Sequence, residues 1–211
     1  MDCMEYLKEK SRKYGYFVSL RGFDGPMDIA NAIRGNDILY DFYDDSESTK
    51  EFIDFCAEGV LWTYRNQMRY ADEVGGGYIS GHGLWMPKNS IGRFSEDAST
   101  LCSPAMYKEF GLPATEKLLE HFDFASLHVH SLGRYCIPIF RQMDKIRIYQ
   151  LTGLEVFEEY EKELNDVIVN LDLNAQTVKD NLAFLNSHKV IVNLVADSID
   201  EVKEVIDLLR D

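Results

Sequence analysis

The sequence lacks any uninterrupted apolar run of the roughly 18 residues that a membrane-spanning helix requires. Its first residues, MDCMEY, also lack the basic segment followed by an apolar stretch that marks a secretory signal. We therefore expect a cytoplasmic protein that does not bind membranes.

Cysteine is scarce, with four residues at positions 3, 56, 102 and 136 and no CxxC pair. Such isolated cysteines are typical of reduced thiols in a cytosolic protein. A zinc site made of cysteine alone is excluded by this spacing.

Basic residues are outnumbered, 22 against 36 acidic residues, which gives a formal net charge of -14. A negative field of this size repels phosphate backbones, so nucleic acid is excluded as a partner class. The 211 residues are 45% hydrophobic and contain no linker or low-complexity tract, so we expect one globular domain over residues 1–211.

The pattern along the chain alternates between strands and helices. Amphipathic or capped segments predict helices, and β-branched or aromatic runs bounded by turn residues predict strands. Residues 81–95 have turn chemistry and are expected to form a loop. The predicted strands are residues 16–20, 78–80, 125–130, 145–150, 167–171 and 190–194, and the predicted helices are residues 1–14, 27–33, 46–73, 103–122, 137–143, 156–164, 178–185 and 199–209.

Such alternation predicts βαβ units and a parallel sheet. The six predicted strands fit an open flavodoxin-like sheet as well as part of a (β/α)8 barrel, which needs eight strands. Periodicity alone does not decide between these two α/β folds.

Several short motifs occur in the order found in one enzyme family. They are GP at 25–26, IRGNDIL at 33–39, FSED at 94–97, SPAMYKEFGLP at 103–113, HSLG at 130–133 and YQ at 149–150. In this order they resemble the uroporphyrinogen decarboxylase superfamily from about residue 16 to the end. The segment at 103–113 is the most specific of them.

This resemblance implies a (β/α)8 TIM barrel that is incomplete here, because the part matching the first strands is missing. It implies an uroporphyrinogen decarboxylase-like protein that acts on a tetrapyrrole-related or small methylated substrate, as a lyase or a methyltransferase. Two alternatives stay open: a corrinoid-dependent methyltransferase-like enzyme, with a corrinoid protein as partner, and a catalytically degenerate binding or scaffold protein.

The departures from the family are specific. The tyrosine that follows the Gly-Pro element in the decarboxylase is absent from residues 27–32, and its late histidine is absent after the last strand. The methyltransferases hold zinc with His-x-Cys and a later cysteine, whereas this chain has Leu132 in the HxC position and no cysteine after Cys136. Neither known activity is intact by these criteria.

Reactive groups in a parallel barrel gather where the strands end, at the carboxyl-terminal face. That rule indicates three catalytic candidates, His130, Glu96 and Asp97. It also indicates ligand-binding candidates at Ser80, His82, Trp85, His128 and Gln150, with Asn170 and Asp172 at the end of the next strand.

His128 and His130 lie two residues apart on a strand and therefore point to the same side. With Glu96 or Asp97 they could hold a divalent metal such as zinc; structural hydrogen bonding is the competing interpretation. Glu96 and Asp97 are an acid–base pair or, because adjacent side chains diverge, Asp97 only caps a helix near Ser103.

We expect Ser80, Glu96, His130 and Gln150 to converge on one concavity, with His82 and Trp85 at its rim. A small molecule is the expected ligand. A barrel that lacks strands leaves two sheet edges open, so we also expect a homo-oligomer paired through those edges or an N-terminal helix that covers one.

Overall fold

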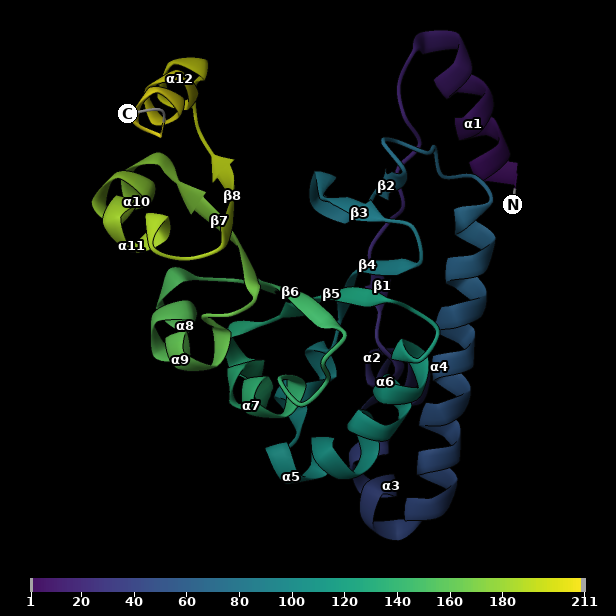
Figure 1. Cartoon of the computed structure of the whole chain (residues 1–211). Coiled ribbons are helices and arrows are strands. Elements are labelled where there is room, and N and C mark those ends of the chain that lie inside the picture. Colours follow the sequence, from purple (N-terminus) through teal and green to yellow (C-terminus); the bar gives the residue numbers. More distant parts are fainter. Residues whose placement is uncertain (1, 210–211) are drawn as a thin grey trace.

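The computed structural model describes residues 2–209, apart from the side chains of Asp2, His82 and Ser131. It is an α/β protein with a six-stranded parallel sheet flanked by helices (Figure 1). The strands of this sheet are β1 (Phe23–Asp24), β4 (Ser90–Ser95), β5 (Phe124–Val129), β6 (Ile146–Leu151), β7 (Ile168–Asn174) and β8 (Val190–Val195).

The strand order is β1-β4-β5-β6-β7-β8, so within this sheet each strand pairs with the one that follows it in the chain order of the sheet, without a reversal. A doubly wound flavodoxin-like sheet requires a point where the order reverses, and that alternative is therefore wrong. Figure 1 shows the strands following an arc, with the connecting helices on its outer side. Among the described strands, β1 and β8 each have one neighbour, so no closed barrel is seen.

The helices are short except for one. They are α1 (Asp2–Tyr14), α2 (Pro26–Arg34), α3 (Ile38–Asp44), α4 (Ser46–Met68), α5 (Pro104–Met106), α6 (Leu112–Leu119), α7 (Ile137–Phe140), α8 (Leu154–Glu159), α9 (Glu161–Leu164), α10 (Ala175–Asp180), α11 (Leu182–Asn186) and α12 (Ile199–Leu208). Over residues 2–209, none of them is both long enough and apolar enough to cross a membrane.

Helix α4 begins where Asp45 accepts a hydrogen bond from the Ser48 amide at 3.4 Å, a typical N-cap. Its buried stripe includes Ile53, Cys56, Val60 and Tyr64, which recur at helical spacing and pack against the rest of the core. Phe55 and Trp62 belong to the same run of apolar residues but do not join this stripe. These side chains are 68% and 67% exposed because they lie on the outer side of the helix.

The later half of the chain folds largely as its pattern predicts. In the earlier half the predicted helices form as α1, α2 and α4, but the strands differ from the prediction. Residues 16–20 form no strand, and the first strand of the sheet is β1 instead. The strand expected at 78–80 is β2 (Gly77–Ile79), which pairs antiparallel with β3 (Trp85–Pro87) in a separate hairpin. The loop expected at 81–95 contains β3 and β4.

The sequence pattern does not predict strand β4, because the residues in the middle of this strand are poor strand formers. Gly92 leaves space for the Ser80 side chain, since a Cβ there would lie 2.4 Å from that of Ser80. Arg93 has φ of 43°, and the register with β5 shifts between Ile91 and Phe94. A bulge of this kind interrupts the alternation of side chains between the two faces of the strand, so the sequence of β4 shows no period of two.

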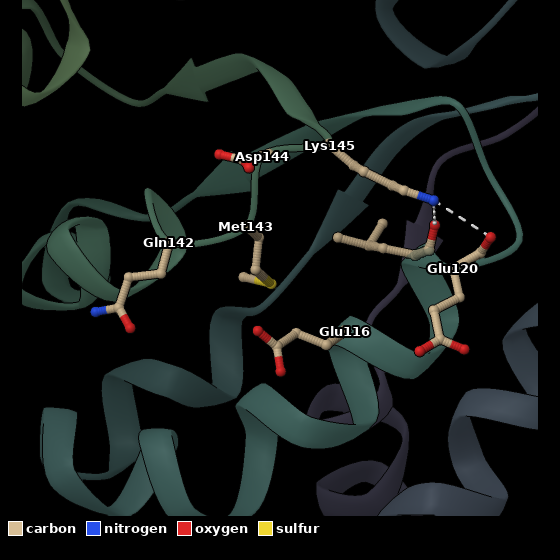
Figure 2. Close-up of a pocket in the computed structure, with 7 residues that line it drawn as sticks. Glu116, Glu120, Gln142, Met143, Asp144 and Lys145 are labelled. Carbon is tan, nitrogen blue, oxygen red and sulfur yellow. Dashed lines mark hydrogen bonds between the residues drawn. The ribbon is translucent and has the colours of Figure 1, made fainter.

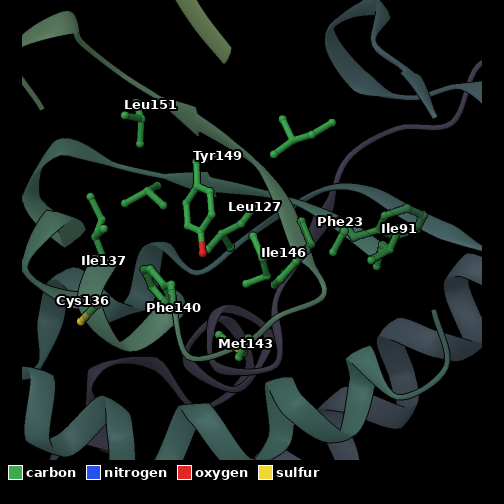
Figure 3. Close-up of a cluster of buried hydrophobic side chains, with 14 of the residues drawn as sticks. Phe23, Ile91, Leu127, Cys136, Ile137, Phe140, Met143, Ile146, Tyr149 and Leu151 are labelled. Carbon is green, nitrogen blue, oxygen red and sulfur yellow. The ribbon is translucent and has the colours of Figure 1, made fainter. Parts of the chain in front are cut away.

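The main core lies between the sheet and the outer helices (Figure 3). Leu127, Tyr149 and Leu151 point from β5 and β6 toward Ile137 and Phe140 of α7. All five are buried, and removing each from water contributes about 1.5–3 kcal/mol. The opposite face of the same strands carries polar side chains, described next.

Candidate functional site

A row of buried polar side chains crosses the inner face of the sheet. Ser95, His128, Gln150 and Asn170 are register partners on β4, β5, β6 and β7. Register partners in a parallel sheet share a face, so these four lie side by side. Each is less than 9% exposed, which makes the row an unusual concentration of buried polar groups.

Hydrogen bonds join this row to the ends of β7 and β8. The Nδ1 of His128 contacts Oε1 of Gln150, and Gln150 Nε2 donates to Asp172 Oδ2 at 3.2 Å. Asn193 Nδ2 in turn donates to Asp172 Oδ1 at 2.8 Å and to Asn170 Oδ1 at 3.2 Å. We call Asp97, His128, Gln150, Asp172 and Asn193 the polar chain.

The polar chain fixes the tautomer of His128. An ionised Asp172 only accepts hydrogen bonds, so the amide nitrogen of Gln150 must face it. The amide oxygen of Gln150 then faces His128, whose Nδ1 must carry the hydrogen. This leaves Nε2 of the neutral imidazole with a free lone pair.

That lone pair faces a carboxylate. His128 Nε2 lies 3.6 Å from Asp97 Oδ1, and the Asp97 side chain is half exposed. Burial lowers the pKa of His128, although Gln150 and the Asp97 charge oppose this effect and the Arg93 cation adds to it. A neutral His128 and an ionised Asp97 are two acceptors side by side, so the pair can take a proton from a ligand and share it.

Asp97 also lines a cavity of about 360 Å³ at the carboxyl ends of β1 and β4. The other polar residues around the cavity include Asp24, Asp28, Asn31 and Thr100. A volume in the range of small-molecule sites, next to a histidine with a free lone pair, marks this end of the sheet as the candidate site.

Glu96 does not join the polar chain. It is 2% exposed, and its Oε1 lies 2.6 Å from the hydroxyl of Thr115 on α6, so it faces the helices. Burial, followed by the charge of Asp28, raises the pKa of Glu96 well above 4.5. The Thr115 hydroxyl also lies 3.0 Å from the Gly111 carbonyl. A protonated Glu96 that donates to Thr115 leaves that hydroxyl free to donate to Gly111.

We expect Glu96→Gln to stabilise the protein at neutral pH. Because the folded pKa is raised, the stability contributed by the proton is complete below pH 4.5 and is lost as pH rises through the folded value. This loss amounts to at most about 1.4 kcal/mol per pH unit. Urea unfolding should therefore show E96Q matching the wild type at pH 4 and exceeding it increasingly toward neutrality.

The control for this substitution is Glu116→Gln, which removes an exposed carboxylate from the same helix as Thr115. E116Q should track the wild type at each pH. A wild-type stability that does not fall relative to E96Q as pH rises would show that Glu96 is ionised in the folded protein.

Asp28 and Ser95 connect the cavity to the sheet. The Ser95 hydroxyl donates to Asp28 Oδ2 at 2.5 Å, and the Ala98 amide donates to Oδ1 at 2.6 Å. Burial raises the pKa of Asp28 despite these two bonds. Sequence reasoning assigned Asp28 no role, because an aspartate in the first turn of a helix normally stabilises the helix dipole.

The other predicted site residues lie in different places. Ser80 is buried just after β2 and is not part of a strand of the parallel sheet. Its hydroxyl donates to the Gly81 carbonyl at 3.2 Å. Trp85 is 46% exposed and donates to the Val74 carbonyl at 2.7 Å, which ties it to the hairpin turn. His130 is exposed just beyond β5. The His82 side chain lies outside the described part.

Of the four residues expected to converge, Ser80, Glu96, His130 and Gln150, only Gln150 belongs to the polar chain. It meets His128 and Asp97 there instead of the other three. Ser103, not Asp97, caps the following helix by accepting from the Met106 amide at 3.2 Å. Sequence reasoning missed Asn193, which stands alone between aliphatic residues of β8. Its only signal was that isolation, which is equally typical of an edge strand.

The residues that the structure describes do not fit a zinc site. Among the described side chains, no three histidine, cysteine or acidic groups come close enough to hold one metal ion. Burial raises the pKa of Cys102 to about 12 and that of Cys136 to about 11, so both thiols are protonated. Protonated thiols are neither zinc ligands nor nucleophiles.

A second cavity, of about 270 Å³, lies before β6 and beside α6 (Figure 2). Lys145 on its wall donates to the carbonyls of Leu119, Glu120 and Phe122 at 2.8–3.3 Å. These carbonyls lie at the last residue of α6 and just beyond it, and the Leu119 carbonyl also accepts from the Phe122 amide at 3.0 Å, so Lys145 has a capping role. The cavity is at the amino ends of the strands, opposite the polar chain, and is not the candidate site.

Comparison with known proteins adds no identification. No protein-family model matches the chain, and neither does any curated protein. What the site does must be inferred from its own geometry.

Proposed function

We propose that this protein is an uroporphyrinogen decarboxylase-like enzyme that transfers a proton to or from a tetrapyrrole-related or small methylated substrate. The observation that carries the proposal is the polar chain, in which Asp172 and Gln150 hold His128 with its Nε2 lone pair toward Asp97. A histidine oriented by a second group is the usual arrangement of a general base or acid.

The fold supports the same proposal. Six parallel strands in sequential order, with their connecting helices on the outer side, fit part of a (β/α)8 barrel, which has eight strands. The unbroken order excludes the doubly wound rival, and the motifs that resemble the superfamily end β4, begin α5 and α6 and follow β5. We propose that the chain is a partial barrel with its site at the carboxyl ends of the strands.

Decarboxylation shows how the site would act. When a carboxylate leaves as carbon dioxide, the electron pair of the broken carbon–carbon bond stays on carbon, which must then take a proton. His128, protonated at Nε2 and paired with Asp97, can deliver that proton. It regains one from solvent through the half-exposed Asp97.

The methyltransferase alternative has less support. It needs zinc ligands that the described residues do not assemble, and its corrinoid protein partner remains a sequence-based expectation. We therefore rank the lyase-type proton transfer first. A binding protein without turnover is the outcome that the following experiment separates from it.

The test is a ligand-observed NMR screen of tetrapyrrole-related and small methylated compounds, with each binder then assayed for turnover. We expect uroporphyrinogen itself to give no product, because its many carboxylates face a chain of net charge -14. Binding with turnover that requires His128 supports the proposal. Binding without turnover identifies a degenerate binding protein, and robust coproporphyrinogen formation contradicts the proposed substrate range.

The exposed edge of β8 supports a homo-oligomer. Residues 190–195 read VIVNLV, without a charge or proline to discourage pairing, and Val195 is 61% exposed. Helix α1 does not cover this edge, since it lies across the molecule from β8 (Figure 1). We therefore propose that two copies pair through β8.

Light scattering should show a dimer for the wild type and a monomer for Val195→Lys, which puts a charge on the edge. Ile33→Lys adds the same charge at an exposed aliphatic residue on α2 and should leave the dimer intact. A wild type that stays monomeric over the accessible concentration range would contradict pairing.

A further inference from the structure

Arg93 occupies the irregular point of β4. Its φ of 43° is in the left-handed region, which a residue other than glycine adopts at a cost of about 1–3 kcal/mol. The register between β4 and β5 shifts at the same place, between Ile91 and Phe94. Bulges of this kind redirect a side chain, and they occur often beside active sites.

Two glycines give the redirected side chain its room. A Cβ at Gly22 would lie 3.0 Å from Nη1 of Arg93, and one at Gly81 would lie 3.6 Å from its Cδ. The arginine therefore passes close to the backbone of Gly22 and Gly81, and it is partly buried.

The charge of Arg93 is not balanced by the residues that the structure describes. Its Nε is buried without a hydrogen-bond partner, and no carboxylate among them lies within ion-pair distance. Other arginines of the chain do find partners, such as Arg141 with Asp166 at 2.7 Å. With 36 acidic residues available, an unpaired and half-buried guanidinium is exceptional.

Arg93 is also close to the candidate site. It lies two residues before Ser95, which is the register partner of His128. A planar guanidinium binds the two oxygens of a carboxylate or phosphate through parallel hydrogen bonds.

We propose that Arg93 binds the oxyanion group of the ligand, a carboxylate or a phosphate, and so places the rest of the ligand against His128. This inference rests on the proposed function for the identity of the reacting site and adds the ligand's chemical class. A single guanidinium fits a ligand that presents one acidic group here. A site with this single cation would favour such a ligand over one with many carboxylates.

The test measures anion binding without turnover. Inorganic phosphate and acetate are titrated separately into the protein, and amide shifts near residues 22, 81 and 93 are followed by NMR. We expect saturable shifts with at least one of them, weakened about tenfold or more in Arg93→Gln, which removes a charge-assisted pair of hydrogen bonds. Which of the two binds more tightly distinguishes phosphate from carboxylate.

Three further variants make the result specific. Arg147→Gln removes an exposed arginine of β6 and should bind the anion as the wild type does. His128→Gln should also bind it, so that a failure of proton transfer and a failure of anion binding can be told apart. Gly22→Ala keeps the charge and crowds Nη1, so it should weaken binding even if Arg93→Gln does not fold. Equal binding by R93Q and wild type, or no saturable binding of either anion, would overturn the proposal.

Discussion

Replacing Gly25 by alanine should lower the free energy of unfolding by about 3 kcal/mol or more, as expected for a buried clash that cannot relax. The backbone of Gly25 has φ of -73° and ψ of 172°, which alanine adopts freely. The added Cβ would nevertheless lie 2.2 Å from the Ser95 carbonyl oxygen and 2.6 Å from Glu96 Oε1. The Ser95 carbonyl belongs to β4, which is held between β1 and β5 and cannot move away.

Gly59→Ala is the matched control, measured by urea unfolding in the same buffer. Gly59 lies inside α4 with nothing within 4 Å of its added Cβ. Alanine there should raise the stability by about 0.5–1 kcal/mol, because glycine is a poor helix former. Similar values for G25A and G59A would mean that α2 does not approach β4 as closely as described.

Once a substrate is found, His128→Gln should lower kcat about 100- to 10,000-fold, the usual range for a general acid or base. Substrate binding should change much less, since glutamine keeps a polar side chain of similar length. His121→Gln, which alters an exposed histidine beyond α6, should leave kcat unchanged. A His128 variant with full activity would remove the proposed mechanism.

The pH dependence provides a second readout of the same site. His128 delivers its proton only when it is protonated, and its pKa is lowered from 6.5. The wild-type rate should therefore fall as pH rises through a value below 6.5, which is the basic limb of the rate profile. Asp172→Asn no longer dictates the orientation of Gln150, so it should move this limb and mix the His128 tautomers seen by ¹⁵N NMR.

The sequence predicted the strands of the later half of the chain better than the strands of the earlier half. Strands β5 to β8 were predictable because each is a β-branched or aromatic run bounded by turn residues, and each follows a helix at regular spacing. Their carboxyl ends placed His128, Gln150 and Asp172 at one face, which the register confirms. Strands β1 and β4 carry no such signal, since one has two residues and the other contains Gly92 and Arg93.

There is a physical reason why the sequence indicated some residues of the site correctly and not others. Sequence spacing determines which side of a strand a residue faces, and by itself it placed His128 and Gln150 in one candidate site. It could not separate Glu96 from Asp97, because their directions depend on how the chain leaves β4. Only the tertiary structure buries Glu96 against Thr115, turns Asp97 toward His128 and leaves the Nε of Arg93 without a hydrogen-bond partner among the described residues. These differences arise from contacts between segments distant in sequence, which decide the charge and the partner of each side chain.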